Sequence, residues 1–261
     1  MNGKLPISVF IIAKNEGDRI AATIRSVKDW VDEVVVVDSG SSDDTVAVSE
    51  FLGARTSYHE WLGYGPQKVH AESLCRNEWL LNLDADEVVD STLRDSILKE
   101  FQSGQPPHCA YRMAFLPIYY VRDRGHITTA RHSPVRLYRR SLAGFKDSTV
   151  HDSVVVREGS VGKLDGVVLH KSFRNLSDHV QKADFYSTMQ AADMVRRGRR
   201  PSALLLFILP PFAFFKSYIL RREFRNGLEG IIASHMYAFQ RFLRQAKTFE
   251  RYWEEENHKG N

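Results

Sequence analysis

The sequence predicts an α/β fold in which a mixed sheet is flanked by helices, followed by a helical C-terminal region. In the first half of the chain, β-branched apolar runs of strand length alternate with stretches of helical apolar spacing. That order is typical of a parallel α/β sheet. In the second half, apolar and polar residues alternate as they do in antiparallel strands, so the sheet is expected to be mixed.

The first strand is expected at residues 7–13, and residues 20–27 have the apolar spacing of a helix. A second buried strand ends at Asp38, and a Gly/Ser turn then leads to a helix at residues 45–54. A loop at residues 61–68 and a helix to residue 76 come before the next buried strand, residues 78–85.

The later strands, which share the alternation of antiparallel sheets, are expected at residues 110–121, 136–140, 153–159 and 166–170. Helices follow from about residue 175, and the composition changes sharply after Arg200. We therefore expect a catalytic domain over residues 1–200 and a helical region over residues 201–261.

The composition indicates which class of partner the protein binds and in which cellular compartment it is expected. A net charge of +4 and a pI near 9.0 suit anionic small molecules or acidic lipids but are too weak to indicate nucleic acid. The two cysteines, Cys75 and Cys109, have no zinc-ligand spacing, which favours a reducing cytoplasm. The N-terminus lacks the pattern of a signal peptide, so we expect a protein that is not exported.

The segment "WLLNLDADEVVD" places several acids directly after a buried run. In an extended chain, Asp84 and Asp86 point to one side while Ala85 faces the other. Two carboxylates on one side suit Mg²⁺ or Mn²⁺, ions that usually keep a substrate phosphate among their ligands. The alternative is a solvated acidic turn. Ligands in open α/β sheets gather at the carboxyl ends of strands, which favours the metal site.

Polar residues also follow the first two strands: Asn15 and Glu16 after the first, Asp38 and Ser39 after the second. These positions are expected to open into the same crevice, where an acid can accept hydrogen bonds from a ribose or a base. The chain has neither the GxGxxG motif of dinucleotide folds nor the glycine-rich loop of P-loop NTPases. A diphosphate is therefore expected to be held by a metal ion.

Taken in order, "SVFIIAKNEGDRI", "VVVVDSGSSDDT", "WLGYGPQK" and "WLLNLDADE" resemble the motifs of family 2 glycosyltransferases with the GT-A fold, a Rossmann-like architecture. The sequence is most similar to the lipopolysaccharide core β-glucosyltransferase subgroup. "RLYRR", "VHD" and the basic helical tail also stand where that subgroup has them, so the resemblance covers nearly the whole chain.

The resemblance implies a nucleotide-sugar donor, UDP-glucose, and a divalent metal ion. Asp38 would lie near the base or ribose, Asp84 near the ribose and sugar, and Asp86 on the metal. The remaining positions that would line the nucleotide pocket follow the strand ends: Ala13, Lys14, Asn15, Glu16, Ser39 and Ala85.

An inverting transfer needs a carboxylate that takes the proton of the acceptor hydroxyl. Asp152 in "STVHDSVVV" stands where the subgroup has a His followed by an acid, and it is the candidate base. The alternative is a surface acid at a strand start, and Asp147 is the nearest competitor. His170 is the candidate additional metal ligand by resemblance, or else a structural hydrogen-bonding residue; His151 is treated in the same way.

Basic residues offer further contacts. Arg136 is a candidate for binding the diphosphate or a phosphorylated acceptor, and Lys68 is a candidate for contacting a phosphate or the sugar. Arg139 and Arg140 are equally well explained as charges that protect a strand edge, and Trp61 as a core residue.

The segment from Ala203 to Phe215 is apolar and lies between arginine clusters. It is shorter than the roughly twenty residues of a membrane span, and Pro210 with Pro211 is expected to break the helix. The pattern predicts docking on an anionic membrane surface, at the cytoplasmic leaflet where a lipid-linked saccharide acceptor lies. A buried hairpin, or a contact within a homo-oligomer, remains as the alternative.

Together with these observations, the resemblance implies a metal-dependent inverting hexosyltransferase, and it alone implies the donor and the lipopolysaccharide inner-core acceptor. The alternatives are a transferase for another lipid-linked polysaccharide, a non-catalytic nucleotide-sugar binding protein, and a sugar-phosphate nucleotidyltransferase. The last would need a glycine-rich basic loop after the first strand, and "KNEGDR" does not provide one.

Overall fold

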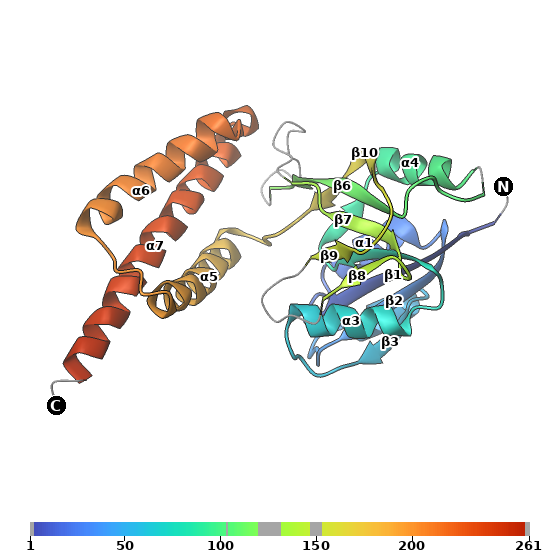
Figure 1. Cartoon of the computed structure of the whole chain (residues 1–261), viewed down its shortest axis with the longest axis horizontal. Coiled ribbons are helices and arrows are strands. Elements are labelled where there is room, and N and C mark those ends of the chain that lie inside the picture. Colours follow the sequence, from blue (N-terminus) through green and yellow to red (C-terminus); the bar gives the residue numbers. More distant parts are fainter. Residues whose placement is uncertain (1–2, 103, 120–131, 147–152, 259–261) are drawn as a thin grey trace. The chain divides into compact units, whose positions relative to one another are not determined.

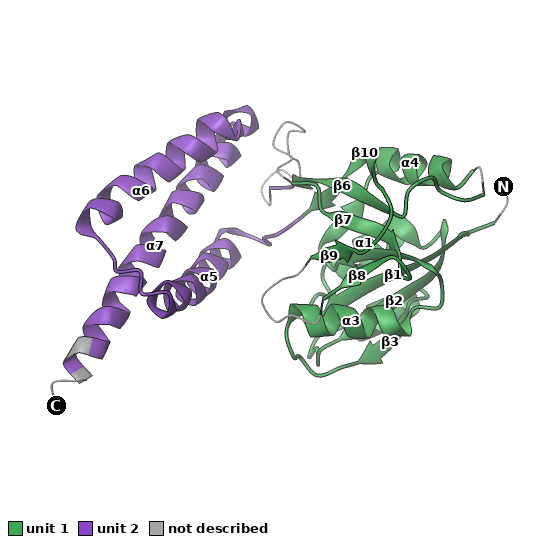
Figure 2. Cartoon of the chain, viewed as in Figure 1, with its two compact units in different colours: residues 1–116, 131–170 green, residues 117–130, 171–261 purple. Residues whose placement is uncertain are grey.

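The computed structural model describes residues 3–102, 104–119, 132–146 and 153–258. The chain divides into two compact units (Figure 2). Unit 1 comprises residues 1–116 and 131–170, and unit 2 comprises residues 117–130 and 171–261.

Unit 1 is built on a mixed sheet. The strands that form it are β1 (Leu5–Ala13), β2 (Val31–Asp38), β3 (Arg55–Tyr58), β4 (Trp79–Asp84), β5 (Glu87–Val89), β6 (Ala110–Pro117), β7 (Val135–Arg139) and β10 (Val161–His170). Within the described residues these eight strands take the order β3-β2-β1-β4-β7-β6-β10-β5. The pairs β3/β2, β2/β1 and β1/β4 are parallel. Strand β7 is antiparallel to β4 and β6, and β10 is antiparallel to β5. The predicted mixed sheet is confirmed.

The central strands are apolar along their length because both of their faces are buried. On β1, the side chains of Ile7, Val9 and Ile11 enter one core and those of Phe10 and Ile12 enter the other. The helices of this unit are α1 (Ile20–Val27), α2 (Thr45–Phe51), α3 (Tyr64–Leu74) and α4 (Ser91–Phe101).

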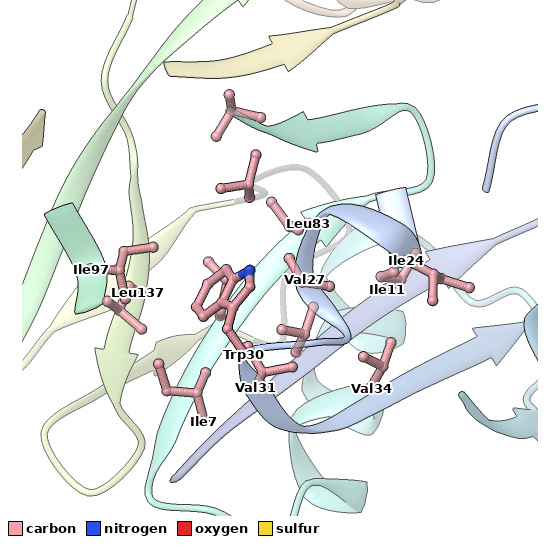
Figure 3. Packing of buried hydrophobic residues seen from close by; sticks show 14 of the residues in the cluster. Ile7, Ile11, Ile24, Val27, Trp30, Val31, Val34, Leu83, Ile97 and Leu137 are labelled. Carbon is pink, nitrogen blue, oxygen red and sulfur yellow. The ribbon is translucent and has the colours of Figure 1, made fainter. Parts of the chain in front are cut away.

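Helices α1 and α4 contribute to the first core, and Figure 3 shows Ile24, Val27 and Trp30 packed against β-strand residues such as Ile7 and Leu83. The second core contains residues of α3 and of the small β8–β9 pair, Ala143–Phe145 and Val154–Val156. The sheet thus lies between helices α1 and α4 on one face and α3 with the β8–β9 pair on the other (Figure 1). The carboxyl ends of its parallel strands are where ligands bind in open α/β sheets.

Helix α3 begins earlier than the sequence indicates. The segment read as a loop over residues 61–68 becomes helical at Tyr64, which puts Lys68 inside the helix. Pro66 suits the first turn, where a backbone N–H has no partner within the helix and is not needed. Lys68 is consequently directed into the structure, with no exposed surface.

Unit 2 is helical. It contains α5 (Leu176–Arg196), α6 (Ala203–Phe215), a π-helical turn (Lys216–Leu220), a short 3₁₀ helix (Glu223–Asn226) and α7 (Leu228–His258). Helix α7 packs along both α5 and α6 (Figure 1). Asn175 caps α5, because its Oδ1 accepts a hydrogen bond of 2.9 Å from the N–H of Asp178.

The expected break at Pro210 and Pro211 is wrong, because both prolines lie inside the continuous helix α6. The π-helical turn extends the helical path, and Ala203–Leu220 is 18 residues long. Among the described helices, this stretch alone is long and apolar enough to cross a membrane by length and composition. With the added turn, the helical segment is long enough to cross a membrane, so the expectation that it is too short for this is not met.

Candidate functional site

The carboxyl ends of three parallel strands meet at one edge of the sheet in unit 1. The strand register pairs Ala13 of β1 with Asp38 of β2, and Ile12 of β1 with Asp84 of β4. Asp38 and Asp84 therefore end the two strands that flank β1, at the same edge of the sheet. The local structure after each strand decides how their side chains are held.

Asp38 folds the turn that follows β2. Its Oδ2 accepts hydrogen bonds from the N–H groups of Gly40 at 2.8 Å and Ser41 at 2.9 Å. Its Oδ1 accepts the hydroxyl of Ser41. A carboxylate has about four acceptor positions, so Asp38 keeps capacity for a further donor such as a ribose hydroxyl.

Asn15 links the end of β1 to the same turn. Its backbone is left-handed, with φ of 56°, a conformation that Asn adopts more readily than most residues. Its N–H donates to Ser41 Oγ at 2.8 Å, and its Oδ1 accepts the N–H of Ser42 at 2.8 Å. The N–H of Glu16 donates to Thr45 Oγ1 at 2.8 Å. Two loops distant in sequence thus form one connected surface, beside which Lys14 is exposed.

Ser39 is fixed by Gln67, a residue that the sequence did not indicate. Gln67 is completely buried on α3, and its Nε2 donates to Ser39 Oγ at 2.9 Å. Its Oε1 lies 2.8 Å from His59 Nδ1. The only sequence signal for this network is the Gln-Lys pair in "GYGPQK", where both side chains prove to be buried.

Asp84 lies between two cations. Lys68 Nζ is 3.1 Å from its Oδ1, and the Arg136 guanidinium is 3.5 Å from its Oδ2. Burial by itself raises the pKa of Asp84, but the charges of Lys68 and Arg136 outweigh it and hold that pKa well below its usual range. Asp84 is therefore a permanent anion, and the two cations that accompany it stabilise its position.

Glu87 is a second residue that sequence reasoning missed. Its side chain is 1% exposed, and its Oε2 accepts the backbone N–H of Asp84 at 2.8 Å. Its Oε1 is 3.4 Å from Arg136, which also donates to the Asn82 side chain. Burial raises the pKa of Glu87 to about 7. Arg136 and Glu87 together brace the turn that carries the acidic pair.

The extended segment assumed for Asp84 and Asp86 ends at Asp84, and Ala85 with Asp86 forms a turn. Thr23 of α1 donates to the Ala85 carbonyl at 2.9 Å and fixes that turn. Asp86 consequently has its own neighbours: its Oδ2 is 3.4 Å from the Arg19 guanidinium, and its Oδ1 is 3.6 Å from His170 Nε2.

The antiparallel ladder explains why Asp86 meets His170, because it pairs His170 of β10 with Glu87 of β5. Burial lowers the pKa of His170, but the Asp86 carboxylate at 3.6 Å and the charges of Glu87 and Asp84 outweigh burial and raise it. No group of three or more metal-ligating side chains occurs within the described ranges. The Asp86 carboxylate fits Mn²⁺ or Mg²⁺, which fill their remaining positions with water and phosphate oxygen, and the His170 imidazole is compatible with Mn²⁺.

The other candidates take different positions. Asp147, His151 and Asp152 lie outside the described residues. Arg140 donates to the Cys75 carbonyl at 2.7 Å, and Arg139 is 3.8 Å from Glu78, so both arginines connect β7 to its surroundings. Trp61 is 42% exposed, which excludes the core role considered for it.

Replacing Asp84 with asparagine is expected to lower the free energy of unfolding by about 3 kcal/mol, because the fully buried Lys68 ammonium loses the carboxylate at 3.1 Å. Lys68→Met is expected to cost less, since the Asp84 side chain is 33% exposed and retains Arg136. Urea denaturation of both single variants and the double variant measures the coupling, expected to be above about 1 kcal/mol.

The surface pair Arg76 and Asp32, with side chains 62% and 40% exposed, is the matched control. The Arg76→Met and Asp32→Asn cycle is expected to give a coupling below about 1 kcal/mol. Equal couplings for the two pairs would contradict the role assigned to Lys68.

Comparisons with known sequences match this chain to one family and to relatives named as glycosyltransferases. The model of the family described as "Glycosyl transferase family 2" matches residues 8–144. A protein of Rickettsia felis (strain ATCC VR-1525 / URRWXCal2), named an uncharacterized glycosyltransferase, is 43% identical over 253 residues, which cover 94% of this chain and 89% of that protein.

LpsC of Rhizobium meliloti (strain 1021), named a lipopolysaccharide core biosynthesis glycosyltransferase, is 34% identical over 257 residues, covering 95% of this chain and 94% of LpsC. Among solved structures, glucosyl-3-phosphoglycerate synthase from Mycobacterium tuberculosis, in complex with Mn²⁺, uridine diphosphate and glucosyl-3-phosphoglycerate, superimposes with a TM-score of 0.45 at 19% identity. The superposition covers 76% of this chain and 81% of that one.

Proposed function

The chain belongs to glycosyl transferase family 2, and we propose that it transfers glucose from UDP-glucose to the inner core of a lipopolysaccharide with inversion at the anomeric carbon. The observation that carries the proposal is that Asp38 and Asp84 end the two strands on either side of β1 at one edge of the sheet, and that Asp86 follows Asp84 with His170 beside it. The similarity to LpsC extends over almost the whole of both chains and supports a lipopolysaccharide acceptor. We place the reaction at the cytoplasmic face of the membrane that holds such an acceptor.

The residues of unit 1 divide into two tasks. Asp38, Ser39 and the segment from Ala13 to Glu16 would bind the uridine, since they form the connected surface at the ends of β1 and β2. Asp86 and His170 would hold Mg²⁺ or Mn²⁺. That ion, when bound, supplies positive charge that stabilises the departing diphosphate.

Asp84 would orient the ribose and the sugar. Lys68 and Arg136, first considered as phosphate or sugar contacts, are directed at Asp84, so we assign them to keeping it charged and in place. In the transfer itself, the acceptor oxygen bonds to the anomeric carbon while the bond from that carbon to UDP breaks. Asp152 would take the proton of the acceptor hydroxyl, and UDP leaves with the bonding electrons.

The test is a thermal-shift panel of UDP-, GDP- and ADP-sugars with Mn²⁺, with Mg²⁺, and with a chelator. UDP-glucose is expected to raise Tm by about 5 °C or more at saturation, because ligand at 100 times Kd adds about 2.7 kcal/mol to the native state. The shift is expected to vanish with the chelator, and slow release of free UDP is expected in the presence of metal.

A selective response to a different UDP-sugar would correct the donor and keep the class. Absence of a response to every nucleotide sugar, with the protein folded and metal present, would overturn the proposed function. It would also show that the acidic cluster has a structural role.

A further inference from the structure

Helix α6 and the π-helical turn after it present apolar side chains outward. From Ala203 to Leu220 only Ala213 and Ser217 are buried. Six of the exposed apolar side chains lie on one face of the helix and form a stripe, defined here as the α6 stripe: Leu204, Phe207, Ile208, Phe212, Phe215 and Ile219. Leu205 and Leu220 are exposed beside it. Phe207 is 83% exposed and Phe212 is 59% exposed.

The inner side of this helical pair has the opposite composition. Besides Ala213 and Ser217, a row of small buried residues spaced four apart lies at the start of α7: Gly230, Ser234 and Ala238. Glu229 and Met236 of the same helix are buried as well. A Cβ at Gly230 would lie 1.8 Å from the Glu223 carbonyl oxygen, so only glycine fits there. Small residues inside and large apolar residues outside are the pattern of helices packed in lipid, where an apolar outer face carries no penalty.

Positive charge flanks the stripe at both ends. Four arginines precede α6, and the turn after it is also basic: Arg196, Arg197, Arg199, Arg200, Lys216, Arg221, Arg222 and Arg225. Within residues 196–227 the one acid is Glu223, which is fully buried and accepts hydrogen bonds from Tyr119 and Asn226. Just before this range, Asp193 forms ion pairs with Arg196 and Arg197, so the four arginines before α6 keep a net positive charge after this pairing. The exposed surface at both ends of the stripe is therefore cationic, which complements lipid phosphates.

This charge arrangement disfavours a second copy of the chain as the partner. Because both ends of the α6 stripe are basic, parallel and antiparallel pairing of two stripes would each place arginines against arginines. An anionic bilayer instead offers phosphates at the level of the arginines and acyl chains at the level of the phenylalanines.

The two prolines indicate how deep the helix lies. Pro210 and Pro211 have no N–H to donate to the carbonyls of Leu206 and Phe207, one turn before them. In the hydrocarbon interior such carbonyls cost several kcal/mol each, whereas water reaches them at the headgroup boundary. The helix is therefore suited to lying along the interface.

We propose that α6 is a membrane-insertion helix that lies along the headgroup boundary of an anionic bilayer. The α6 stripe enters the acyl chains, and the arginine clusters at its two ends bind lipid phosphates. The inference rests on the proposed function in one respect only. That respect is the role given to membrane binding, which is to hold unit 1 at the membrane that contains the acceptor. The binding surface itself is argued from unit 2 alone.

The test is flotation of the full-length protein with vesicles of phosphatidylcholine, alone or in an equimolar mixture with phosphatidylglycerol. The protein is expected to float with the anionic vesicles only. The Phe207→Ser/Phe215→Ser variant is expected to lose at least about tenfold in partition, because a buried Phe contributes roughly this much or more. The Arg199→Gln/Arg222→Gln variant is expected to lose about fivefold for each arginine.

Phe51→Ser is the matched control, since Phe51 is 88% exposed on α2 of unit 1 and is expected to have no effect. A second measurement does not depend on loss of binding: Phe207→Trp fluorescence is expected to be quenched by phospholipids brominated on their acyl chains, and Phe51→Trp fluorescence is not. Metal-dependent UDP release by each variant reports on unit 1 separately, so failure of membrane binding and failure of the proposed activity are distinguishable.

Three outcomes would overturn the inference. One is a protein that stays soluble with both kinds of vesicle. The second is an equal loss of binding in the Phe51→Ser variant. The third is a stable dimer, shown by sedimentation, that the Phe207→Ser/Phe215→Ser variant converts to monomer without any vesicle binding in either form.

Discussion

Asp86→Asn is expected to remove the metal dependence of UDP binding and to lower kcat/KM by about 10³-fold or more, since the bound cation contributes several kcal/mol to the transition state. The amide has almost the shape of the carboxylate but lacks its charge. His170, 3.6 Å from Asp86 Oδ1, is then left as a single neutral nitrogen donor, which does not hold a hard cation by itself. Titration calorimetry of UDP with and without Mn²⁺, followed by transfer kinetics, measures both effects.

Asp95→Asn is the control for this substitution. Asp95 is an exposed acid on α4, and its carboxylate contacts the neighbouring Arg94. Its replacement is expected to leave binding and transfer unchanged. Undiminished Mn²⁺ dependence in the Asp86→Asn variant would remove Asp86 from the proposed metal site.

Asp152→Asn is expected to retain metal-dependent UDP binding and to lose about 10² to 10⁴-fold in kcat, the usual contribution of a general base. The physical reason is that the base meets the acceptor hydroxyl and not the nucleotide. Measuring UDP affinity and transfer to the acceptor in the same preparation separates the two effects.

The Asp147→Asn variant is the matched control, because Asp147 is the nearest other acid in the same segment. It is expected to keep both binding and transfer. Equal loss of UDP affinity in the Asp86 and Asp152 variants would sink the assignment of Asp152 as base, and loss of transfer in the Asp147 variant alone would move the base to Asp147.

Local patterns were sufficient for the first three central strands. The buried runs that end at Ala13, Asp38 and Asp84 form parallel neighbours, because a strand with both faces covered must be apolar throughout. Adjacent parallel strands end at one edge, so the grouping of Asp38 with Asp84 follows from the order of elements.

The start of α3 could not be read locally, because Gly63 to Pro66 has the composition of a turn. Tertiary packing overrides that composition and makes residues 64–74 helical. Lys68 and Gln67 are buried as a result, which no propensity of a polar residue indicates. The same limit applies to Pro210 and Pro211, which the helix accommodates within an exposed segment beside α7.

Contacts between segments that are distant in the sequence could not be predicted from local patterns either. The pairing of Glu87 with His170 depends on the register of two antiparallel strands, and a shift of one residue would turn His170 to the other face. The bracing of Asp84 by Arg136 similarly depends on the placement of β7 beside β4. The types of residue that form this site could thus be predicted from the sequence. Which of them contact one another depends on the register between strands that are distant in the sequence.

The ends of the strand order have a consequence for the behaviour of the protein at high concentration. Within the part of the chain that the structure describes, the sheet ends in β3 and β5, which are 4 and 3 residues long. Short edge strands offer few unpaired backbone groups to another chain, which is one way in which proteins avoid aggregation through sheets. Self-association of this chain, where it occurs, is therefore expected to involve helical surfaces, and unit 1 is expected to resist amyloid-like assembly.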